Sequence, residues 1–271
     1  MTVNPISDLD IVLLQHPLEW ENPEANRLMF QQVIEGLTVP AHLIVLPEMF
    51  TTGFSMEPNR VAELMGTESP TALWMLRMAA LTGAVICGSV SALVGNRHVN
   101  RLLWASPDGS LGHYDKRHLF TFGGEHLHYV RGHERPIFNL HGWRICPLIC
   151  YDLRFPVWSR NSLNEGVPAY DILLYVANWP AVRRAPWQQL LPARAIENLS
   201  YVAGLNRTGT DAQGQEYAGD SIILGPWGQT LADAPPHTPA ILSARLSRTL
   251  LDDFRQKFPA LEDADGFVFD C

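Results

Sequence analysis

Cysteine is scarce in this sequence of 271 residues, and the few cysteines form no framework. Cys87, Cys146, Cys150 and Cys271 are scattered, and two of them fall within one apolar run. On a single extended strand, Cys146 and Cys150 would lie roughly 13 Å apart at about 3.3 Å per residue, beyond the reach of a disulfide. We therefore expect free thiols in a reducing compartment.

Long apolar runs and basic clusters are also missing. No stretch approaches the roughly 18 to 20 apolar residues that span a bilayer, and the first ten residues, MTVNPISDLD, lack the basic and apolar regions of a secretory signal. The net charge of -8 is spread along the chain. We expect no nucleic-acid or membrane partner and a cytoplasmic location.

The first connection from a strand to a helix, LLQHPLEWENPE, contains no glycine. A doubly wound sheet that binds a dinucleotide usually carries a glycine-rich phosphate loop at this point. The missing loop disfavours dinucleotide binding. A doubly wound sheet therefore remains only an alternative to the fold that we favour below.

Short apolar runs alternate with helical patterns in an order that occurs twice. The first half predicts strands at 10–15, 42–48 and 83–90, helices at 23–36 and 70–82, and a hairpin at 100–115. The second half predicts strands at 143–150, 171–180 and 200–207, helices at about 153–164 and 187–198, a hairpin at 220–233 and a last strand at 240–246.

Strands that are apolar on both faces favour packing of one sheet on another, with helices outside. We therefore expect an α/β fold, a four-layer α-β-β-α sandwich of two mixed sheets. No linker or low-complexity segment interrupts residues 1–271, so we expect a single domain. The tail from about residue 250 either docks on a partner subunit or packs as a terminal strand on its own chain.

Four expected strands end in side chains that can take part in chemistry. These ends are Glu48, Lys116, Cys150 and the pair Asn178 and Trp179. Ligands of α/β folds bind outside the carboxyl ends of strands, which favours a shared site. Taken singly, each residue has an ordinary explanation: a solvated glutamate, a surface lysine or a small buried cysteine.

Together these residue types suit amide hydrolysis. A thiol attacks well only as thiolate, and a neighbouring base with a cation close by makes that state accessible. The same base can then protonate the leaving nitrogen. A lysine and a backbone N–H just after the nucleophile can stabilise the tetrahedral oxyanion. Glu48, Lys116 and Cys150 could fill these roles without a metal or cofactor.

The sequence resembles the carbon–nitrogen hydrolase, or nitrilase, superfamily. Glu48 in VLPEMF, Lys116 in YDKRHLF and Cys150 in ICYDLRFP stand in that family's order and spacing, and the resemblance runs from the first strand to about residue 246. It implies the α-β-β-α sandwich, a covalent thioester and frequent dimers. Glu48 would be general base and then acid, Lys116 would stabilise the tetrahedral intermediate, and Cys150 would be the nucleophile.

The resemblance also implies a second glutamate in the site, between the lysine motif and a downstream glycine. GGEHLHYVRG offers Glu125, with Gly132 at the matching distance. We expect Glu125 to position Lys116 and the substrate amide.

Three stretches, VANWP, ARAIEN and LNRTGTDAQGQEYAGDS, resemble the branch that contains the ω-amidases. Enzymes of that branch hydrolyse the terminal amide of 2-oxoglutaramate or 2-oxosuccinamate to the dicarboxylate and ammonia. Nitrilases and other aliphatic or N-carbamoyl amidases keep the same triad and remain alternatives, because the triad does not fix the substrate.

Further residues are candidates for substrate binding. Arg154 could hold a substrate carboxylate by a bidentate pair, or could bridge Asp152 or a helix end. Phe54 and Trp179 could be pocket walls or core residues. Tyr151 would offer its backbone N–H to the oxyanion, and Asn178 ends its strand beside them.

Two alternatives come from other functional classes. Histidines crowd one segment, at positions 113, 118, 126, 128 and 133, which could suggest a metal-dependent hydrolase. The strand-end residues could also be merely structural, in a scaffold without catalysis. Residues 209–220 are expected as a turn-rich connection.

Overall fold

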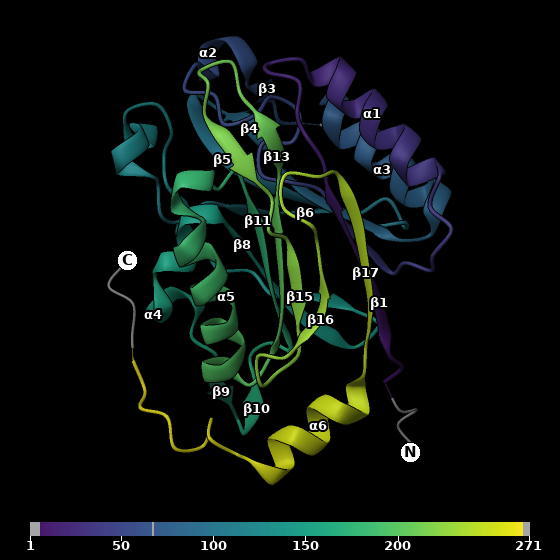
Figure 1. Ribbon diagram of the computed structural model, residues 1–271, viewed down its shortest axis with the longest axis vertical. Helices are drawn as coiled ribbons and strands as arrows, with labels where there is room; N and C mark the ends of the chain where they lie inside the picture. The colour runs from purple at the N-terminus through teal and green to yellow at the C-terminus, as the bar shows by residue number, and fades with distance from the viewer. Residues whose placement is uncertain (1–5, 67, 268–271) are drawn as a thin grey trace.

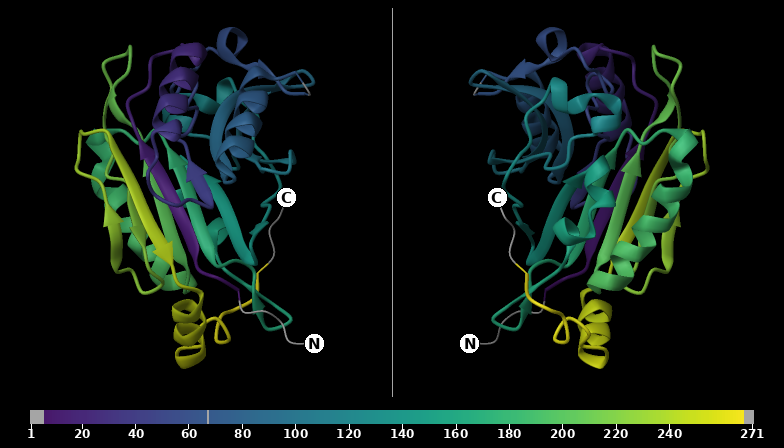
Figure 2. Two further views of the ribbon diagram at one scale, coloured as in Figure 1. Left: turned by 90° about the vertical axis from the view of Figure 1, so that its right-hand side faces the viewer. Right: turned by 90° about the vertical axis from the view of Figure 1, so that its left-hand side faces the viewer.

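The computed structural model describes residues 6–66 and 68–267, which form two β-sheets that lie face to face with helices outside (Figure 1; Figure 2). The first sheet contains β1 (Leu9–Gln15), β2 (Leu43–Val45), β3 (Glu63–Leu64), β4 (Val85–Val94), β5 (Arg97–Ala105), β6 (Leu111–Asp115) and β17 (Ala240–Leu246). The second contains β7 (Phe138–Leu140), β8 (Trp143–Ile149), β11 (Ile172–Ala177), β12 (Tyr201–Asn206), β15 (Ile222–Leu224) and β16 (Thr230–Asp233). Two small hairpins pair β9 (Leu163–Asn164) with β10 (Val167–Pro168) and β13 (Thr208–Thr210) with β14 (Glu216–Ala218).

The helices are α1 (Pro23–Glu35), α2 (Pro58–Val61), α3 (Pro70–Thr82), α4 (Pro156–Ser159), α5 (Arg184–Asn198) and α6 (Arg248–Lys257), with 3-10 turns η1 (Thr121–Gly123), η2 (Glu125–Leu127), η3 (Cys150–Arg154) and η4 (Ala181–Arg183). α1 and α3 lie side by side on one outer face, and α5 lies on the opposite one (Figure 1; Figure 2). The predicted four-layer α-β-β-α sandwich is confirmed.

The two sheets repeat one topology. In the first, β1, β2 and β4 are parallel neighbours and β5 and β6 follow as an antiparallel hairpin. In the second, β8, β11 and β12 are parallel neighbours and β15 and β16 form the hairpin. The repeat places the carboxyl ends of both sets of parallel strands around one end of the sandwich, as the duplicated pattern predicts.

Alternation along β1 explains why its strand is apolar on both faces. Ile11 and Leu13 are fully buried in the core that the two sheets share, whereas Val12 and Leu14 are buried in the core under α1 and α3. Successive strand residues point to opposite faces, so each face of the sheet supplies a separate core. Full burial of one such side chain contributes roughly 1.5 to 3 kcal/mol.

Local signals fix the ends of the two long helices on the first sheet. α1 begins after Asn22, whose Oδ1 accepts a hydrogen bond from the Ala25 N–H at 3.1 Å, with Pro23 at the first helical position. α3 begins after Ser69 and ends at Gly83, which has the left-handed φ of 70°. Both helices match the sequence prediction.

The helix predicted at 153–164 is wrong. The chain instead forms η3, the four-residue α4 and the strand β9. Hydrogen bonds of Asn161 hold the chain out of a helix: its N–H donates to Asn198 Oδ1 at 2.8 Å and its Nδ2 donates to the Tyr170 carbonyl at 3.0 Å. Glu165 and Gly166, with φ of 53° and 78°, then turn the β9–β10 hairpin.

The segment after β17 begins with α6, which packs on its own chain. Arg248 and Arg255 of α6 reach the buried carboxylate of Asp171 at 3.1 and 2.6 Å, and Leu251 is fully buried. The docking of the tail on a partner subunit stays a prediction, and Cys271 lies outside the described residues. None of the described helices has the length and apolarity needed to cross a bilayer.

Candidate active site

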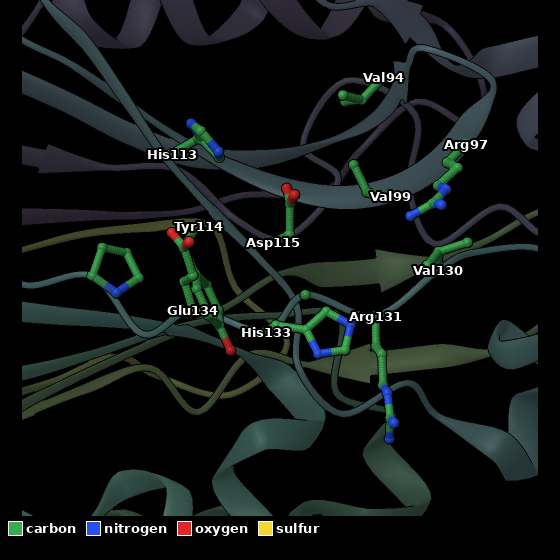
Figure 3. A pocket seen from close by; sticks show the side chains of 12 residues that line it. Val94, Arg97, Val99, His113, Tyr114, Asp115, Val130, Arg131, His133 and Glu134 are labelled. Carbon is green, nitrogen blue, oxygen red and sulfur yellow. The ribbon is translucent and has the colours of Figure 1, made fainter. Parts of the chain in front are cut away.

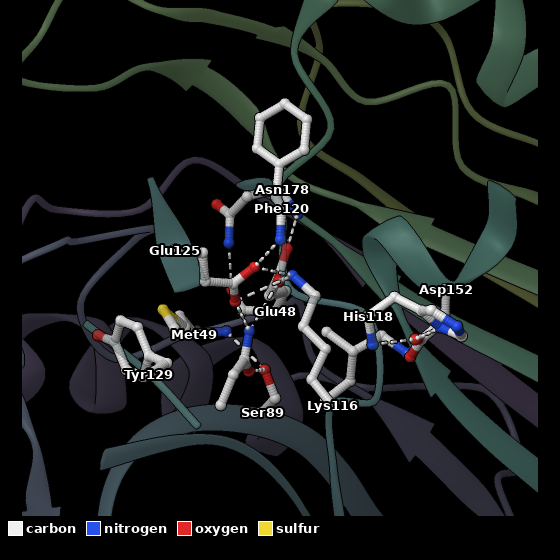
Figure 4. Close-up of polar contacts among 12 residues, drawn as sticks. Glu48, Met49, Ser89, Lys116, His118, Phe120, Glu125, Tyr129, Asp152 and Asn178 are labelled. Carbon is white, nitrogen blue, oxygen red and sulfur yellow. Dashed lines mark hydrogen bonds and ion pairs between the residues drawn. The ribbon is translucent and has the colours of Figure 1, made fainter. Parts of the chain in front are cut away.

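Glu48, Lys116 and Glu125 form a buried cluster at the carboxyl end of the strands (Figure 4). Lys116 directly follows β6, and its Nζ lies 2.8 Å from Glu48 Oε1, 3.1 Å from Glu125 Oε1 and 3.0 Å from Glu125 Oε2. Glu125 also accepts the Phe120 N–H at 2.6 Å, which closes the loop after Lys116. The structure thus brings together three of the four residues expected to be catalytic.

Gly132, expected downstream of Glu125, sits where no side chain fits. Its N–H donates to the Lys116 carbonyl at 2.9 Å, and an added Cβ would lie 2.2 Å from the Asp115 carbonyl oxygen. The chain after Glu125 therefore passes directly against the strand end that carries the lysine.

Asn100 of β5 joins the two carboxylates and was missed by sequence reasoning. Its Nδ2 donates to Glu48 Oε1 at 2.8 Å and to Glu125 Oε1 at 3.3 Å. Its Oδ1 accepts from Ser89 Oγ at 2.8 Å, which fixes the orientation of the amide. Ser89 Oγ in turn accepts the Met49 N–H at 2.9 Å, so the residue after Glu48 is held by the same network.

Asn178, at the end of β11, connects the second sheet to Glu48. The Asn178 N–H donates to Glu48 Oε2 at 2.7 Å, and its Nδ2 donates to the Glu48 carbonyl at 2.6 Å. Among the described residues, the buried Asn178 Oδ1 has no hydrogen-bond partner. An unpaired buried acceptor is costly, so this oxygen suits a ligand that brings an N–H or O–H group.

Cys150 is the first residue of η3 and directly follows β8, at a sharp turn of the chain. Its φ of 45° is left-handed, a conformation that costs free energy in a residue with a side chain. Asp152 holds the turn: its carboxylate accepts the Ile149 N–H at 3.0 Å, the Tyr114 hydroxyl at 2.8 Å and the His118 N–H at 3.0 Å. Because Tyr114 and His118 flank Lys116 in the chain, Asp152 ties the cysteine turn to the lysine strand.

Burial and the neighbouring charge of Glu48 favour the protonated form of the Cys150 thiol. Burial, and next the charge of Glu48, raise the pKa of the Cys150 thiol well above its ordinary value. Burial alone would lower the pKa of the Lys116 amine, but Glu125 and Glu48 together raise it. A free thiolate would add a second net negative charge to the buried cluster. Passing the thiol proton to Glu48 during attack leaves the net charge of the cluster unchanged.

Cys87 and Cys146 differ from Cys150 in their surroundings. Both are buried core residues, and burial raises the pKa of Cys146 to about 12. Neither lines the cavity at which Cys150 lies. Only Cys150, among the described cysteines, combines a carboxylate neighbour with access to a cavity.

The Cys150 cavity is small, with a volume of about 40 Å³. It is lined by Phe54, Phe120, Cys150, Tyr151, Arg154, Asn178, Trp179, Pro180, Arg183 and Tyr217. All the residues expected to bind substrate are in this set. Lys116 Nζ lies 5.1 Å from the centre of the Phe54 ring, which joins the cavity wall to the charged cluster.

Arg154 lies at the rim of the cavity with its guanidinium 5.1 Å from the centre of the Trp179 ring. In the described residues it forms no ion pair with Asp152 or any other carboxylate. The bridging alternative for Arg154 is therefore not observed, and its charge is available to a ligand.

Arg183 and Tyr217 are lining residues that the sequence did not reveal. Arg183 ends η4, and its guanidinium lies 4.7 Å from the centre of the Phe122 ring and 5.6 Å from that of Phe120. Tyr217 comes from β14, inside the segment expected only as a connection, and its hydroxyl donates to Asp211 at 2.9 Å.

The histidine-rich segment does not gather into a metal site. His113 and His133 line a separate surface cavity of about 330 Å³ with Arg97, Asp115, Arg131 and Glu134 among its other walls (Figure 3). His118 instead pairs with Asp152 at 2.8 Å and stacks on Phe155. In the described part of the chain, no three His, Cys, Asp or Glu residues are placed to share a metal ion.

Comparisons with known proteins agree with this geometry. Residues 11–256 match the carbon-nitrogen hydrolase family. Omega-amidase YafV from Escherichia coli is 49% identical over 259 residues, covering 96% of this chain and 98% of that protein. A 2-oxoglutaramate amidase from Bacillus subtilis is 33% identical over 256 residues, covering 93% and 96%. The crystal structure of a CN-hydrolase superfamily protein from Xanthomonas campestris, with an arsenic adduct in its active site, has a TM-score of 0.94 at 44% identity and covers 97% of this chain and 99% of that chain. The chain therefore belongs to the carbon–nitrogen hydrolase family.

Proposed function

We propose that the protein hydrolyses the terminal amide of a short 2-oxo dicarboxylic acid monoamide to the carboxylate and ammonia, through a thioester on Cys150. The observation that carries the proposal is the buried cluster of Glu48, Lys116 and Glu125 beside Cys150, at a cavity of about 40 Å³. This set supplies a nucleophile, a base and a fixed positive charge at one point.

The proposed reaction uses Glu48 twice. Glu48 takes the thiol proton as Cys150 Sγ bonds to the amide carbon, and the Lys116 ammonium and the Tyr151 N–H stabilise the oxyanion. Glu48 then gives the proton to the nitrogen as the C–N bond breaks and ammonia leaves. Water attacks the thioester with Glu48 again as base, the C–S bond breaks, and the thiol regains its proton.

Glu125 has a supporting role in this proposal. Its two oxygens lie 3.1 and 3.0 Å from Lys116 Nζ, so it fixes the ammonium from one side while Glu48 does so from the other. Burial raises the pKa of the Glu125 carboxyl, with Glu48 adding to the rise and Lys116 opposing it.

An amide fits the cavity better than a nitrile. Asn178 lines the cavity, and its buried Oδ1, which has no partner among the described residues, can accept a hydrogen bond from an amide NH₂ group. A nitrile carries no N–H and would leave this oxygen unpaired. The arsenic adduct of the Xanthomonas relative also supports a reactive thiol, because arsenic compounds bind thiols strongly.

The carboxylate end of the substrate is assigned to Arg154. Among the described residues its guanidinium pairs with no carboxylate, and it lies over the Trp179 ring at the rim of the cavity. Two relatives are named as enzymes for such substrates, an ω-amidase and a 2-oxoglutaramate amidase. The small size of the cavity disfavours bulky amides.

We further propose that the chain is one domain, acts in the cytoplasm and forms a homodimer. The free thiols of Cys87, Cys146 and Cys150 support a reducing compartment. Exposed apolar side chains support an interface between copies; Val157 is 56% and Ile196 is 55% exposed on α4 and α5.

Ammonia release across a panel of substrates tests the function. The panel contains 2-oxoglutaramate, 2-oxosuccinamate, an uncharged aliphatic amide, a short nitrile and an N-carbamoyl amino acid. We expect the two oxo-acid amides to have the highest kcat/KM. A nitrile or N-carbamoyl compound that is turned over faster would overturn the assignment.

A further inference from the structure

Two arginines without protein carboxylate partners face the Cys150 cavity. Arg154 and Arg183 both line it, and neither forms an ion pair in the described residues. The next residue, Arg184, is different: it reaches Asp220 at 2.6 Å and does not line the cavity. None of the ten lining residues is acidic, so the mouth is positive although the chain carries a net charge of -8.

Aromatic rings support both guanidiniums. Arg154 lies over Trp179, and Arg183 lies over Phe122 and Phe120. The two supports are joined, because Trp179 Nε1 donates to the Arg183 carbonyl at 2.7 Å. A guanidinium spread on an aromatic face keeps its N–H edge available for a ligand, and two such groups form an anion-binding mouth.

Two cations in the lining of one small cavity can distinguish between substrates that share an amide and a carboxylate. A 2-oxo acid ends in two carboxylate oxygens and a ketone oxygen, and these oxygens can accept hydrogen bonds from two guanidiniums. The corresponding amino acid, asparagine or glutamine, carries an ammonium in place of the ketone. That ammonium would face the second guanidinium at close range, and like charges repel.

We propose that Arg183 is a specificity-determining residue that selects 2-oxo acid amides and rejects 2-amino acid amides. In this arrangement Arg154 binds the carboxylate of the substrate and Arg183 binds the adjacent ketone oxygen. The inference rests on the proposed function, and it explains how the site would avoid hydrolysing asparagine and glutamine, which have the same chain length, amide and carboxylate as the oxo-acid amides.

The test compares three four-carbon compounds in wild type and Arg183→Gln. They are 2-oxosuccinamate, succinamate, which lacks the ketone, and asparagine, which is also measured as an inhibitor. We expect Arg183→Gln to raise the KM for 2-oxosuccinamate about 10- to 100-fold, to change that for succinamate less, and to leave asparagine binding as tight or tighter. The ratio of the asparagine Ki to the 2-oxosuccinamate KM should fall at least about tenfold.

Two further variants separate specificity from structure. Arg184→Gln removes the neighbouring charge, which does not line the cavity, and should keep the ratio of the wild type. Arg183→Lys keeps the charge and should retain most of the rejection of asparagine. It also keeps the proposal testable if Arg183→Gln does not fold.

Distinct results overturn the two proposals. A ratio within twofold of the wild type in Arg183→Gln, or loss of rejection in Arg183→Lys, overturns the role of Arg183 alone. A wild type that releases ammonia from neither 2-oxosuccinamate nor succinamate overturns the proposed function, and the Arg183 role falls with it.

Discussion

Lys116 Nζ lies 2.8 Å from Glu48 Oε1, and both side chains are fully buried. A buried ion pair costs desolvation free energy, and removal of one partner leaves an uncompensated charge. The desolvation free energy of this ion pair has no structural benefit that a pair of apolar side chains could not give. The pair is useful, however, beside a thiol that must lose its proton to a base. Neutral replacements of similar shape are the informative changes at this site.

Glu48→Gln keeps the shape of the side chain but removes the base. We expect kcat for amide hydrolysis to fall by about 10²- to 10⁴-fold, because proton transfer from the Cys150 thiol and to the leaving nitrogen is lost. The measurement is steady-state ammonia release, with circular dichroism to show that the fold is retained. Glu134→Gln, which changes a glutamate in the separate cavity of Figure 3, should leave kcat unchanged. Equal activity of Glu48→Gln and the wild type would remove Glu48 from the mechanism.

Arg154→Ala should raise the KM for oxo-acid amides about 10- to 100-fold and affect uncharged amides far less. The reason is the loss of a charge-assisted, bidentate contact with the substrate carboxylate. Initial rates on 2-oxoglutaramate and on an uncharged aliphatic amide measure the difference. Losses of equal size on both would show that Arg154 does not bind the carboxylate.

Gly132→Ala should destabilise the fold and lower kcat together. The new Cβ would lie 2.2 Å from the Asp115 carbonyl oxygen, so the strand end that carries Lys116 must move. Such overpacking costs about 1 to 3 kcal/mol. Gly66→Ala is the control, because nothing lies within 4 Å of an added Cβ there. Thermal unfolding and ammonia release check both variants, and a wild-type Tm and kcat for Gly132→Ala would contradict the close contact.

Asp171→Asn should lower the free energy of unfolding by about 3 to 5 kcal/mol near pH 7, because three arginines lose a buried carboxylate. Burial alone would raise the pKa of the Asp171 carboxyl, but hydrogen bonds from Arg144 and the charges of Arg255, Arg144 and Arg248 lower it. Its stabilisation is thus complete above the ordinary pKa of an aspartate and is lost as the pH falls through the lower pKa of the folded state.

Urea unfolding at pH 7 and at about pH 3 checks this sign. The difference between the wild type and Asp171→Asn should shrink at the lower pH. Asp253→Asn, a change at an exposed residue of α6, serves as control and should differ little from the wild type at either pH. A difference that grows on acidification would be inconsistent with a lowered pKa.

The succession of strands along the chain and the strand ends could be predicted from the sequence, because they follow from local patterns. Apolar runs between turn signals located β2, β6, β8 and β11, and the residues after them were therefore identifiable as site candidates. The failed helix at 153–164 shows the limit. A helix was expected there from the repeated order of elements, but long-range hydrogen bonds from Asn161 to Asn198 and Tyr170 hold the chain in a different path.

Residues recruited from the middle of strands and from loops could not be predicted. Asn100 lies within β5, and only the pairing of strands far apart in the sequence brings it to Glu48 and Glu125. Arg183 and Arg184 are adjacent, and no pattern in the sequence indicates which of them faces the cavity. The structure alone separates them, since one is paired with Asp220 and the other faces the cavity.

The most direct measurement of the central claim is ammonia release by Cys150→Ala from the best substrate of the panel, with Cys146→Ala as control. Each variant removes one buried thiol: Cys146 lies within β8, and Cys150 directly follows it. Only Cys150 lies beside Glu48 and the cavity. We expect Cys150→Ala to lose at least about 10³-fold in kcat while it unfolds like the wild type, and Cys146→Ala to stay active. A Cys150→Ala variant that releases ammonia within tenfold of the wild-type rate would contradict the thioester mechanism.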